Sequence, residues 1–404
     1  MSAAPLTVVG IGAEGWEGLG EPARAALRSA EVIVGSRRQF DLLAGVEAEL
    51  RPWPTPIDPL VDELAAGPDR PTAVLASGDP MLHGIGATLA RRLPVDRLRV
   101  IPHHSAFALA CARLGWPAAE VELVSAVGRP PEVVARVLQP GRRLVAYAAG
   151  AEGAAGVARV ARERGFGRAR MVVLEQLGGA GERLHETTPD EWDSRAAAPL
   201  HAVALDCGRP VDAPLLPITP GLPDDAYESD GQLTKRGVRA IALAALAPAP
   251  GQLLWDVGAG SGSIGIEWLR AEPTARAIAI EARADRAERA AANARRLGVP
   301  RLEVRHGEAP GALDDLEAPD AVFVGGGVTE HGVLERCWAA LRPGGRIVAN
   351  AVTLEGESRL VEARAAHGGG LMRIALEHAD EVGRFTAWRA QLPVVQWSAR
   401  KGAA

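Results

Sequence analysis

The chain has 404 residues, of which 47% are hydrophobic and 24% charged, and its formal net charge is -5. This composition is that of a globular protein and excludes disordered, collagenous and coiled-coil classes. Because typical domains contain about 100–200 residues, the length predicts two domains. The acidic balance argues against nucleic acid as the main partner, because binding to phosphates requires a basic surface.

The three cysteines, Cys111, Cys207 and Cys337, lie far apart and show neither metal-ligand spacing nor a disulfide framework. We interpret them as small buried hydrophobic residues and expect no metal site. No apolar run approaches the roughly 18 residues of a membrane span, and Met1–Leu6 lacks the features of a signal peptide. We therefore expect a cytoplasmic protein with no membrane partner.

In the first half of the chain, short apolar runs alternate with helical stretches, which predicts α/β architecture. Helices are predicted at Ile85–Arg92 and Ala106–Leu114. The predicted strands, in chain order, are Leu6–Gly10, Val32–Gly35, Ala73–Ala76, Leu98–Ile101, Arg143–Ala146, Met171–Leu174 and Ala202–Asp206.

A glycine-rich turn follows the first predicted strand, where Gly10, Gly12 and Gly15 fit the pattern G-x-G-x-x-G. Taken alone, this pattern predicts a dinucleotide site. The next strand, Val32–Gly35, does not end in the carboxylate that such sites use to hold a ribose. A NAD-dependent oxidoreductase therefore stays open as an alternative.

Two further loops follow later strands, namely Gly78-Asp79-Pro80 and Pro102-His103-His104-Ser105. Together with Gly10-Ile11-Gly12 they resemble the tetrapyrrole methylase family, the class III enzymes that use S-adenosylmethionine (SAM). Gly35–Arg38 and Ala112–Trp116 resemble the CbiE-type branch of that family. The resemblance implies a class III fold and SAM contacts from Gly10, Gly12, Gly78, Asp79, Pro80, Leu82 and Ser105.

Two histidines near these loops need a separate interpretation. His104 stands where the family usually has serine, so the contact that this serine makes is not expected here. His83 lies beside a glycine, and we interpret it as structural rather than catalytic.

Prolines at positions 210, 214, 217, 220 and 223 crowd the stretch from Gly208 to Asp224. Proline has no backbone donor and disfavours helix in the residue before it, so this stretch predicts a linker. We expect a first domain at 1–208, a linker at 209–223 and a second domain at 224–404. We see no internal repeat that relates the two halves.

Strands and helices alternate more regularly in the second half, which predicts a parallel doubly wound sheet that binds ligands beyond the carboxyl ends of its strands. The predicted helices are Thr234–Leu246, Ile264–Arg270, Asp285–Leu297, Glu330–Leu341 and Ser358–Ala366. The predicted strands are Leu253–Val257, Ala277–Ile280, Leu302–Arg305, Ala321–Val324, Arg346–Ala349, Leu371–Glu377 and Phe385–Val395.

A second glycine turn, Gly258-Ala259-Gly260-Ser261-Gly262, follows a buried strand. Glycine permits positive φ and lets a ligand approach the backbone closely. Ser263 replaces the third glycine of the dinucleotide pattern, so SAM, which has no phosphate, suits the loop better than NAD. Glu281 ends the next strand, where a carboxylate can accept hydrogen bonds from a ribose.

The ordered motifs from this turn to Leu341–Arg346 resemble the class I SAM methyltransferases, which have a Rossmann-like fold. Gly231–Arg239, the glycines at 325–327 and Asn350–Glu355 resemble their CbiT-type precorrin branch. The resemblance implies SAM contacts from Asp256, Gly258, Gly260, Gly262, Glu281, Glu308, Ala309 and Gly325, with Glu308 standing where aspartate is commoner.

A CbiE-like half fused to a CbiT-like half resembles the CobL-type family, the decarboxylating precorrin-6B C5,15-methyltransferases of cobalamin biosynthesis. The resemblance implies methyl transfer to carbons 5 and 15 of precorrin-6B, loss of the ring C acetate carboxyl, one SAM per domain and a homo-oligomer. By analogy, the second half acts at carbon 15 and decarboxylates. A methyltransferase acting on RNA or another small metabolite stays open, as does a non-catalytic role for one half.

A substrate of this kind carries many carboxylates, which arginine binds bidentately. Methyl transfer requires alignment more than an acid or a base, so we expect a mostly apolar pocket and name no catalytic residue. Thr234 can also cap its helix. The candidate substrate-binding residues are Arg37, Arg38, Thr234, Lys235, Arg236 and Arg239.

Overall fold

The computed structural model describes residues 5–150, 152–192 and 197–402. Residues 1–4, part of the segment on which the expectation of no signal peptide rests, lie outside this range. Within the described residues, no helix combines the length and the apolar character that crossing a bilayer requires. The three cysteines are free and buried, which confirms their interpretation as small core residues.

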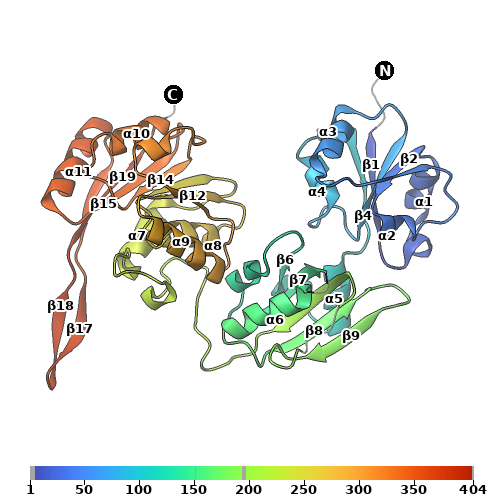
Figure 1. Cartoon of the computed structure of the whole chain (residues 1–404), viewed down its shortest axis with the longest axis horizontal. Coiled ribbons are helices and arrows are strands. Elements are labelled where there is room, and N and C mark those ends of the chain that lie inside the picture. The colour runs from blue at the N-terminus through green and yellow to red at the C-terminus, as the bar shows by residue number, and fades with distance from the viewer. Residues whose placement is uncertain (1–4, 151, 193–196, 403–404) are drawn as a thin grey trace. The chain divides into compact units, whose positions relative to one another are not determined.

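Contacts divide the chain into two compact units. The first comprises Met1–Pro131 and Pro140–Ala213, and the second comprises Glu132–Gln139 and Pro214–Ala404. Among the described residues, the first unit contains two five-stranded sheets, and the second contains a seven-stranded sheet and a two-stranded ribbon (Figure 1). The α/β architecture expected from the sequence is confirmed.

The first sheet is parallel and has the strand order β3-β2-β4-β1-β5. Val8 packs with one apolar cluster and Val9 with another, because successive side chains point to opposite faces. Both faces are covered, which explains the continuous apolar runs. The elements are β1 (Leu6–Ile11), α1 (Glu21–Arg28), β2 (Val32–Gly35), α2 (Arg37–Phe40), β3 (Glu49–Pro52), α3 (Asp58–Ala66), β4 (Thr72–Ser77), α4 (Ile85–Ala90), β5 (Leu98–Ile101) and α5 (Ala106–Leu114).

The second sheet of this unit is mixed, with the order β6-β7-β10-β8-β9. Strands β6 and β7 are parallel, and the other neighbours are antiparallel. Ala110 and Cys111 of α5 pack against this sheet. The sequence prediction missed β3, β6 and β9. The elements are β6 (Val121–Ser125), β7 (Arg143–Ala149), α6 (Gly153–Glu163), β8 (Arg170–Glu175), β9 (Arg183–Thr187) and β10 (Leu200–Asp206).

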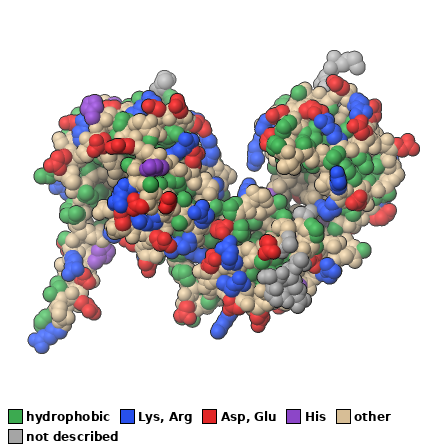
Figure 2. Space-filling view, viewed as in Figure 1, with side chains coloured by type: hydrophobic (Ala, Val, Ile, Leu, Met, Phe, Trp, Pro, Cys, Tyr) green, Lys and Arg blue, Asp and Glu red, His purple; other side chains and the backbone are tan. Residues whose placement is uncertain are grey.

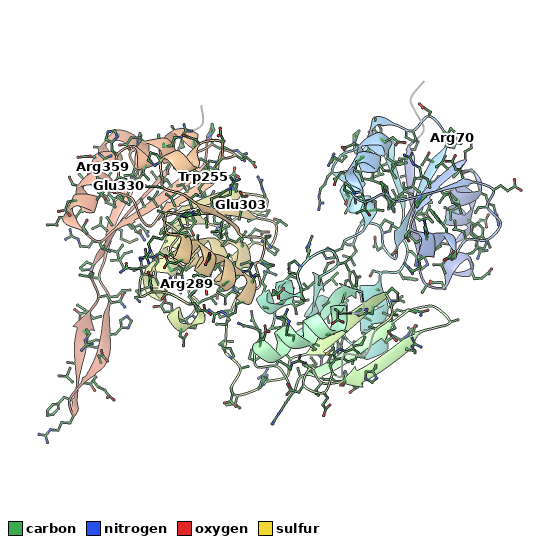
Figure 3. All side chains as sticks on the ribbon, viewed as in Figure 1. Arg70, Trp255, Arg289, Glu303, Glu330 and Arg359 are labelled. Carbon is green, nitrogen blue, oxygen red and sulfur yellow. The ribbon has the colours of Figure 1, made fainter. Side chains whose placement is uncertain are left out.

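The sheet of the second unit has the order β13-β12-β11-β14-β15-β19-β16. The first five strands are parallel, and β19 is antiparallel to both neighbours. Trp255, at the centre of β11, is 1% exposed (Figure 3). The elements are α7 (Arg236–Leu246), β11 (Leu253–Val257), α8 (Ser263–Ala271), β12 (Arg276–Glu281), α9 (Ala284–Arg296), β13 (Glu303–His306), β14 (Ala321–Val324), α10 (Val333–Ala340), β15 (Arg346–Ala351), α11 (Leu354–His367), β16 (Gly370–Ile374) and β19 (Val394–Arg400).

The end of the chain corrects the prediction of two late strands, Leu371–Glu377 and Phe385–Val395. Four strands occupy this region, and two of them, β17 (Glu377–Val382) and β18 (Phe385–Ala390), pair only with each other as a projecting ribbon (Figure 1). Every residue of the ribbon strands is exposed. Alternating apolar and polar residues predict a strand but do not tell whether it joins a sheet.

Part of the proline-rich stretch is anchored in the second unit by a buried ion pair. Glu267 accepts hydrogen bonds from the backbone nitrogens of Gly221 and Leu222 at 2.6 and 3.1 Å. It also accepts from the Tyr227 hydroxyl at 2.8 Å and from Arg239 Nε at 2.6 Å. Arg239 is 0% exposed. The prediction that Arg239 binds a substrate carboxylate is therefore wrong, because its guanidinium is enclosed and already paired.

Candidate functional site

A cavity of about 710 Å³ lies at the carboxyl ends of the parallel strands of the second unit. This volume is in the range of small-molecule sites. Of the residues predicted to bind a ligand, the cavity is lined by Thr234, Lys235, Gly258, Gly260, Glu281, Glu308, Ala309 and Gly325.

The turn after β11 requires glycine for both conformation and space. Gly258 has φ +69°, and a Cβ atom on it would lie 2.5 Å from the backbone nitrogen of Gly326. The Gly326 nitrogen donates to the carbonyl of Val257, so the ends of β11 and β14 touch here. This contact forms a floor of bare backbone that a flat ligand can approach closely.

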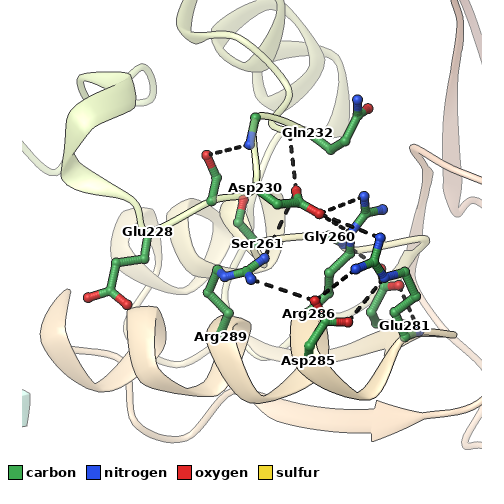
Figure 4. Close-up of polar contacts among 12 residues, drawn as sticks. Glu228, Asp230, Gln232, Gly260, Ser261, Glu281, Asp285, Arg286 and Arg289 are labelled. Atoms are coloured by element: carbon green, nitrogen blue, oxygen red, sulfur yellow. Dashed lines mark hydrogen bonds and ion pairs between the residues drawn. The ribbon is translucent and has the colours of Figure 1, made fainter.

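Glu281 lies beside this floor and holds the turn in place. Its Oε2 accepts from the Gly260 nitrogen at 2.7 Å and its Oε1 from the Arg283 nitrogen at 3.0 Å (Figure 4). The residue is 5% exposed and lines the cavity. Each carboxylate oxygen has a second lone pair, so Glu281 can also accept from a ligand hydroxyl.

Asp256 and Gly262 do not line the cavity, although the sequence placed them in the site. Asp256 is 1% exposed, and its Oδ2 accepts from the Gly265 nitrogen at 2.9 Å, which ties β11 to the first turn of α8. Burial raises the pKa of Asp256 to about 7, and the nearby charge of Glu281 acts in the same direction. Gly262 has φ +77° and packs against Ala290. Both residues support the turn from beneath.

Residues 232–235 line one side of the cavity, and we call the segment 228–235, to which they belong, the strap. Asp230 of the strap accepts from Arg286 Nε at 2.8 Å and lies 3.7 and 3.9 Å from Arg283 and Arg289 (Figure 4). Its hydrogen bond with Arg286 is the main reason that the pKa of Asp230 is lowered. Helix α9 thereby fixes the strap beside the glycine turn.

The cavity extends beyond β14 to the rims of β15 and β19. Asn350 and Val352, at the end of β15, line this part with Lys235. Gln396 is 2% exposed and donates to Asn350 Oδ1 at 3.0 Å, which fixes that side chain. Arg236 is exposed and does not line the cavity. Lys235 is therefore the one cation of the predicted pair placed to meet a ligand there.

The first unit brings its three predicted motifs together at one edge of its parallel sheet. Strands β4, β1 and β5 are neighbours, so Gly78 and His103, which follow β4 and β5, lie beside Gly10 near the end of β1. A Cβ on Gly10 would lie 2.4 Å from the Gly78 carbonyl oxygen and 2.8 Å from His103 Cβ. Gly78 has φ +62° and faces the His104 carbonyl. As in the second unit, glycine is what permits the contact.

The loop after Gly78 folds tightly on itself. Asp79 Oδ1 accepts from the Met81 nitrogen at 2.8 Å, and the Leu82 nitrogen donates to the Asp79 carbonyl. Gly84 packs on Pro80, since a Cβ there would lie 2.6 Å from the proline carbonyl oxygen. His83 consequently adopts φ +58°, the left-handed region that side chains other than glycine rarely enter.

Tyr147 of β7 joins the two sheets of the first unit, and sequence reasoning missed it. Its hydroxyl accepts from the Phe107 nitrogen at 2.9 Å, next to Ser105, whose side chain caps α5. Its ring meets the His83 ring edge to face at 6.2 Å. Burial is the main reason that the pKa of Tyr147 is raised. No motif marks Tyr147, because it reaches the rim only when the two sheets pack.

The first unit also contains a contact between an acid and an imidazole. His103 Nε2 is 3.2 Å from Glu14 Oε1, and the His103 side chain is 8% exposed. Arg38 donates to Ser77 Oγ at 2.9 Å, which places its guanidinium at the end of β4, while Arg37 is exposed on α2. Among the described residues there is no cluster of three or more potential metal ligands.

Two family profiles match the chain. Residues 5–193 match the family described as Tetrapyrrole (Corrin/Porphyrin) Methylases, and residues 225–401 match the Precorrin methyltransferase domain. Each match covers one of two glycine-built rims, as we call the carboxyl edges of the parallel sheets at Gly10 and Gly78 in the first unit and at Gly258 and Gly326 in the second.

Similar proteins of known name match either the whole chain or about half of it. A protein of Sinorhizobium sp named precorrin-6Y C(5,15)-methyltransferase (decarboxylating) is 44% identical over 98% of this chain and 96% of its own length. The cobalt-precorrin-7 C(5)-methyltransferase of Salmonella typhimurium is 33% identical over 45% of this chain and 89% of its length. The "Probable cobalt-precorrin-6B C(15)-methyltransferase (decarboxylating)" of Pyrobaculum calidifontis is 34% identical over 44% of this chain and 93% of its length.

Proposed function

The chain belongs to the family of precorrin-6Y C(5,15)-methyltransferases (decarboxylating), and on this premise we propose that it methylates precorrin-6Y at carbons 5 and 15 and removes one carboxyl group as carbon dioxide. The resemblance in the sequence implies precorrin-6B as substrate, whereas the full-length relative is named for precorrin-6Y. The observation that carries the proposal is the presence of two separate glycine-built rims in one chain, each at the carboxyl edge of a parallel sheet.

One SAM molecule binds at each rim in this proposal. The residues of the second unit fit the ligand, because the floor at Gly258 and Gly326 leaves no room for a Cβ and Glu281 offers free lone pairs to a ribose. SAM supplies an activated methyl group. The protein aligns the acceptor carbon with that group, and alignment alone can lower the barrier by about 7–11 kcal/mol.

We assign carbon 15 and the decarboxylation to the second unit and carbon 5 to the first. This division follows the names of the two half-length relatives and the position of the precorrin methyltransferase profile in residues 225–401. The extended cavity of the second unit suits it, because the part beyond β14 leaves space for an acceptor next to the nucleoside.

The carboxylates of the substrate are bound by cations at the two rims. Lys235 lines the cavity of the second unit, with Thr234 beside it. Arg38 is held at the end of β4 by Ser77. Arg37 and Arg236 are the sequence neighbours of Arg38 and Lys235. Both are exposed and add positive charge at the surface. Exchanging Lys235 for Met should raise the KM for the tetrapyrrole and leave the Kd for SAM unchanged.

The protein forms a homo-oligomer through the β17–β18 ribbon in this proposal. Phe385 is 67% exposed and Trp388 is 73% exposed, and Figure 2 shows apolar and charged side chains mixed along the projection. A lone two-stranded ribbon is marginally stable in water, so burial against a second copy would stabilise it. Light scattering should give a multiple of the chain mass for the wild type and a smaller mass for the double variant Phe385→Ser, Trp388→Ser.

Mass spectrometry of the product tests the central proposal. The protein, incubated with precorrin-6Y and SAM, should yield a product with two added methyl groups and one lost carbon dioxide. Calorimetric titration with S-adenosylhomocysteine should give two sites per chain, and NADH should give none. An unchanged tetrapyrrole mass, with binding of NADH, would support the oxidoreductase alternative instead.

A further inference from the structure

The two proposed methyl transfers differ in how the macrocycle becomes neutral again. In both, an electron pair of the macrocycle forms the carbon–methyl bond, the methyl–sulfur bond breaks, and an iminium-like cation remains. At carbon 15, the pair from the broken bond to carbon dioxide neutralises this cation. At carbon 5 no carboxyl group leaves, so the pair must come from the C–H bond of the methylated carbon, and a base must take up the proton. The first unit therefore needs a group that the second does not.

His83 lies at the edge of the first unit's parallel sheet, in the loop that is proposed to hold SAM there. Its backbone belongs to the loop of Gly78, Asp79 and Pro80, and its ring lies against Tyr147 from the other sheet, so it is held where the two sheets meet. His83 is exposed to solvent. Its left-handed backbone, at φ +58°, is strained, and strain of this kind accumulates at functional sites.

Although its sequence context indicates a structural residue, we propose that His83 is the catalytic base that accepts the proton from carbon 5 of the tetrapyrrole in the first unit. This inference rests on the proposed function of that unit. The C–H bond breaks, its electron pair restores the conjugated double bond, and the proton passes to an imidazole nitrogen. Exposure of the ring then lets the proton leave to water.

The surroundings of His83 suit this role. Partial burial of the ring is the main reason that the pKa of His83 lies below its ordinary value of 6.5, and the charge of Arg129 lowers it further. The imidazole is therefore neutral at physiological pH and able to accept a proton. The other groups near it are the Tyr147 hydroxyl, already bonded to Phe107, and the Asp79 carboxylate, which bonds Met81. His103, by contrast, is mostly enclosed and faces Glu14.

The substitution His83→Asn separates chemistry from backbone strain, because asparagine tolerates the left-handed conformation and carries no base. We expect kcat for methylation at carbon 5 to fall roughly a hundredfold, the lower end of what general bases contribute. Added imidazole should restore part of the rate. Methylation at carbon 15, decarboxylation and SAM affinity should be unchanged, and substrate deuterated at carbon 5 should react more slowly in the variant than unlabelled substrate.

The pH profile of the wild type gives a second measurement that does not depend on the variant folding. Methylation at carbon 5 should lose rate as pH falls through the lowered pKa of His83, where the ring becomes protonated, and this limb should vanish in His83→Asn. A variant rate within twofold of the wild type, or a loss that imidazole does not rescue and that accompanies lost SAM binding, overturns the role of His83. A wild type that never methylates carbon 5 overturns the proposed function of the first unit, and this inference falls with it.

Discussion

The two rims of this chain are built by the same device but from different parts of the sequence. In the second unit, successive loops of one parallel sheet supply the turn at Gly258, the acid Glu281 and the contact at Gly326. In the first unit, one sheet supplies Gly10 and Gly78, while Tyr147 arrives from another sheet. The comparison teaches that a site within one doubly wound sheet can be found in chain order, whereas a site between two sheets is only half visible.

The most direct test of this comparison is to place a side chain at one rim at a time. Gly10→Ala and Gly258→Ala each place a Cβ within about 2.5 Å of backbone atoms. We expect each variant to lose its own methyl transfer by more than about a hundredfold, since a small misplacement of reacting groups costs that much. The other methyl transfer should remain. Mass spectrometry counts the methyl groups, and calorimetry should count one binding site in place of two.

Gly251→Ala is the matched control for Gly258→Ala. Gly251 also has a positive φ, +72°, but no atom lies within 4 Å of its Cβ position. It therefore carries the backbone strain without the collision, and that strain costs roughly 1–2 kcal/mol. If Gly251→Ala lost methyl transfer as Gly258→Ala does, general destabilisation would explain both, and the rim would lose its support.

The second expected effect is on stability and is confined to the second unit. Glu267→Ala leaves the enclosed Arg239 without a countercharge and leaves the Tyr227 hydroxyl without its acceptor. Breaking a buried pair in this way costs about 3–5 kcal/mol. Hydrogen exchange measured on the full chain should be faster in the second unit of Glu267→Ala than in that of the wild type. Exchange rates in the first unit should be unchanged. Glu317→Ala removes exposed pairs with Arg276 and Arg342 and should cost at most about 1 kcal/mol per pair.

The sequence predicted most of the second unit and less of the first, for physical reasons. Strand β11 and its glycine turn were identified because buried parallel strands are continuous apolar runs that end in glycine. Strand β9 was missed because its side chains are partly exposed and mixed in character. Arg239 was misassigned because a cation before a sheet looks the same in sequence whether it faces a substrate or a buried Glu267.

Asp256 provides a third test of the comparison. It is a carboxylate buried beneath the glycine turn, and the described residues of the first rim include no equivalent. Its folded pKa of about 7 lies above the ordinary 3.8, so the folded chain holds the proton more tightly. The wild type should therefore lose stability relative to Asp256→Asn as pH rises from about 4 to about 7. The difference should reach about 4 kcal/mol, at about 1.4 kcal/mol for each of the roughly three pKa units, and stay constant above that range. Denaturant titrations across pH measure it; a constant difference at every pH would show that folding does not raise the pKa of Asp256.

The smallest expected effect concerns the contact between the two sheets of the first unit, which has no counterpart in the single-sheet site of the second unit. Tyr147→Phe keeps the ring against His83 and removes the acceptor of the Phe107 nitrogen, which lies in the first turn of α5. We expect a loss of about 1 kcal/mol, the usual net value of one hydrogen bond, seen as a several-fold rise in the KM for SAM at carbon 5. Methylation at carbon 15 should not change. If kcat at carbon 5 fell and the KM did not, Tyr147 would act on the reacting carbon rather than on the position of α5.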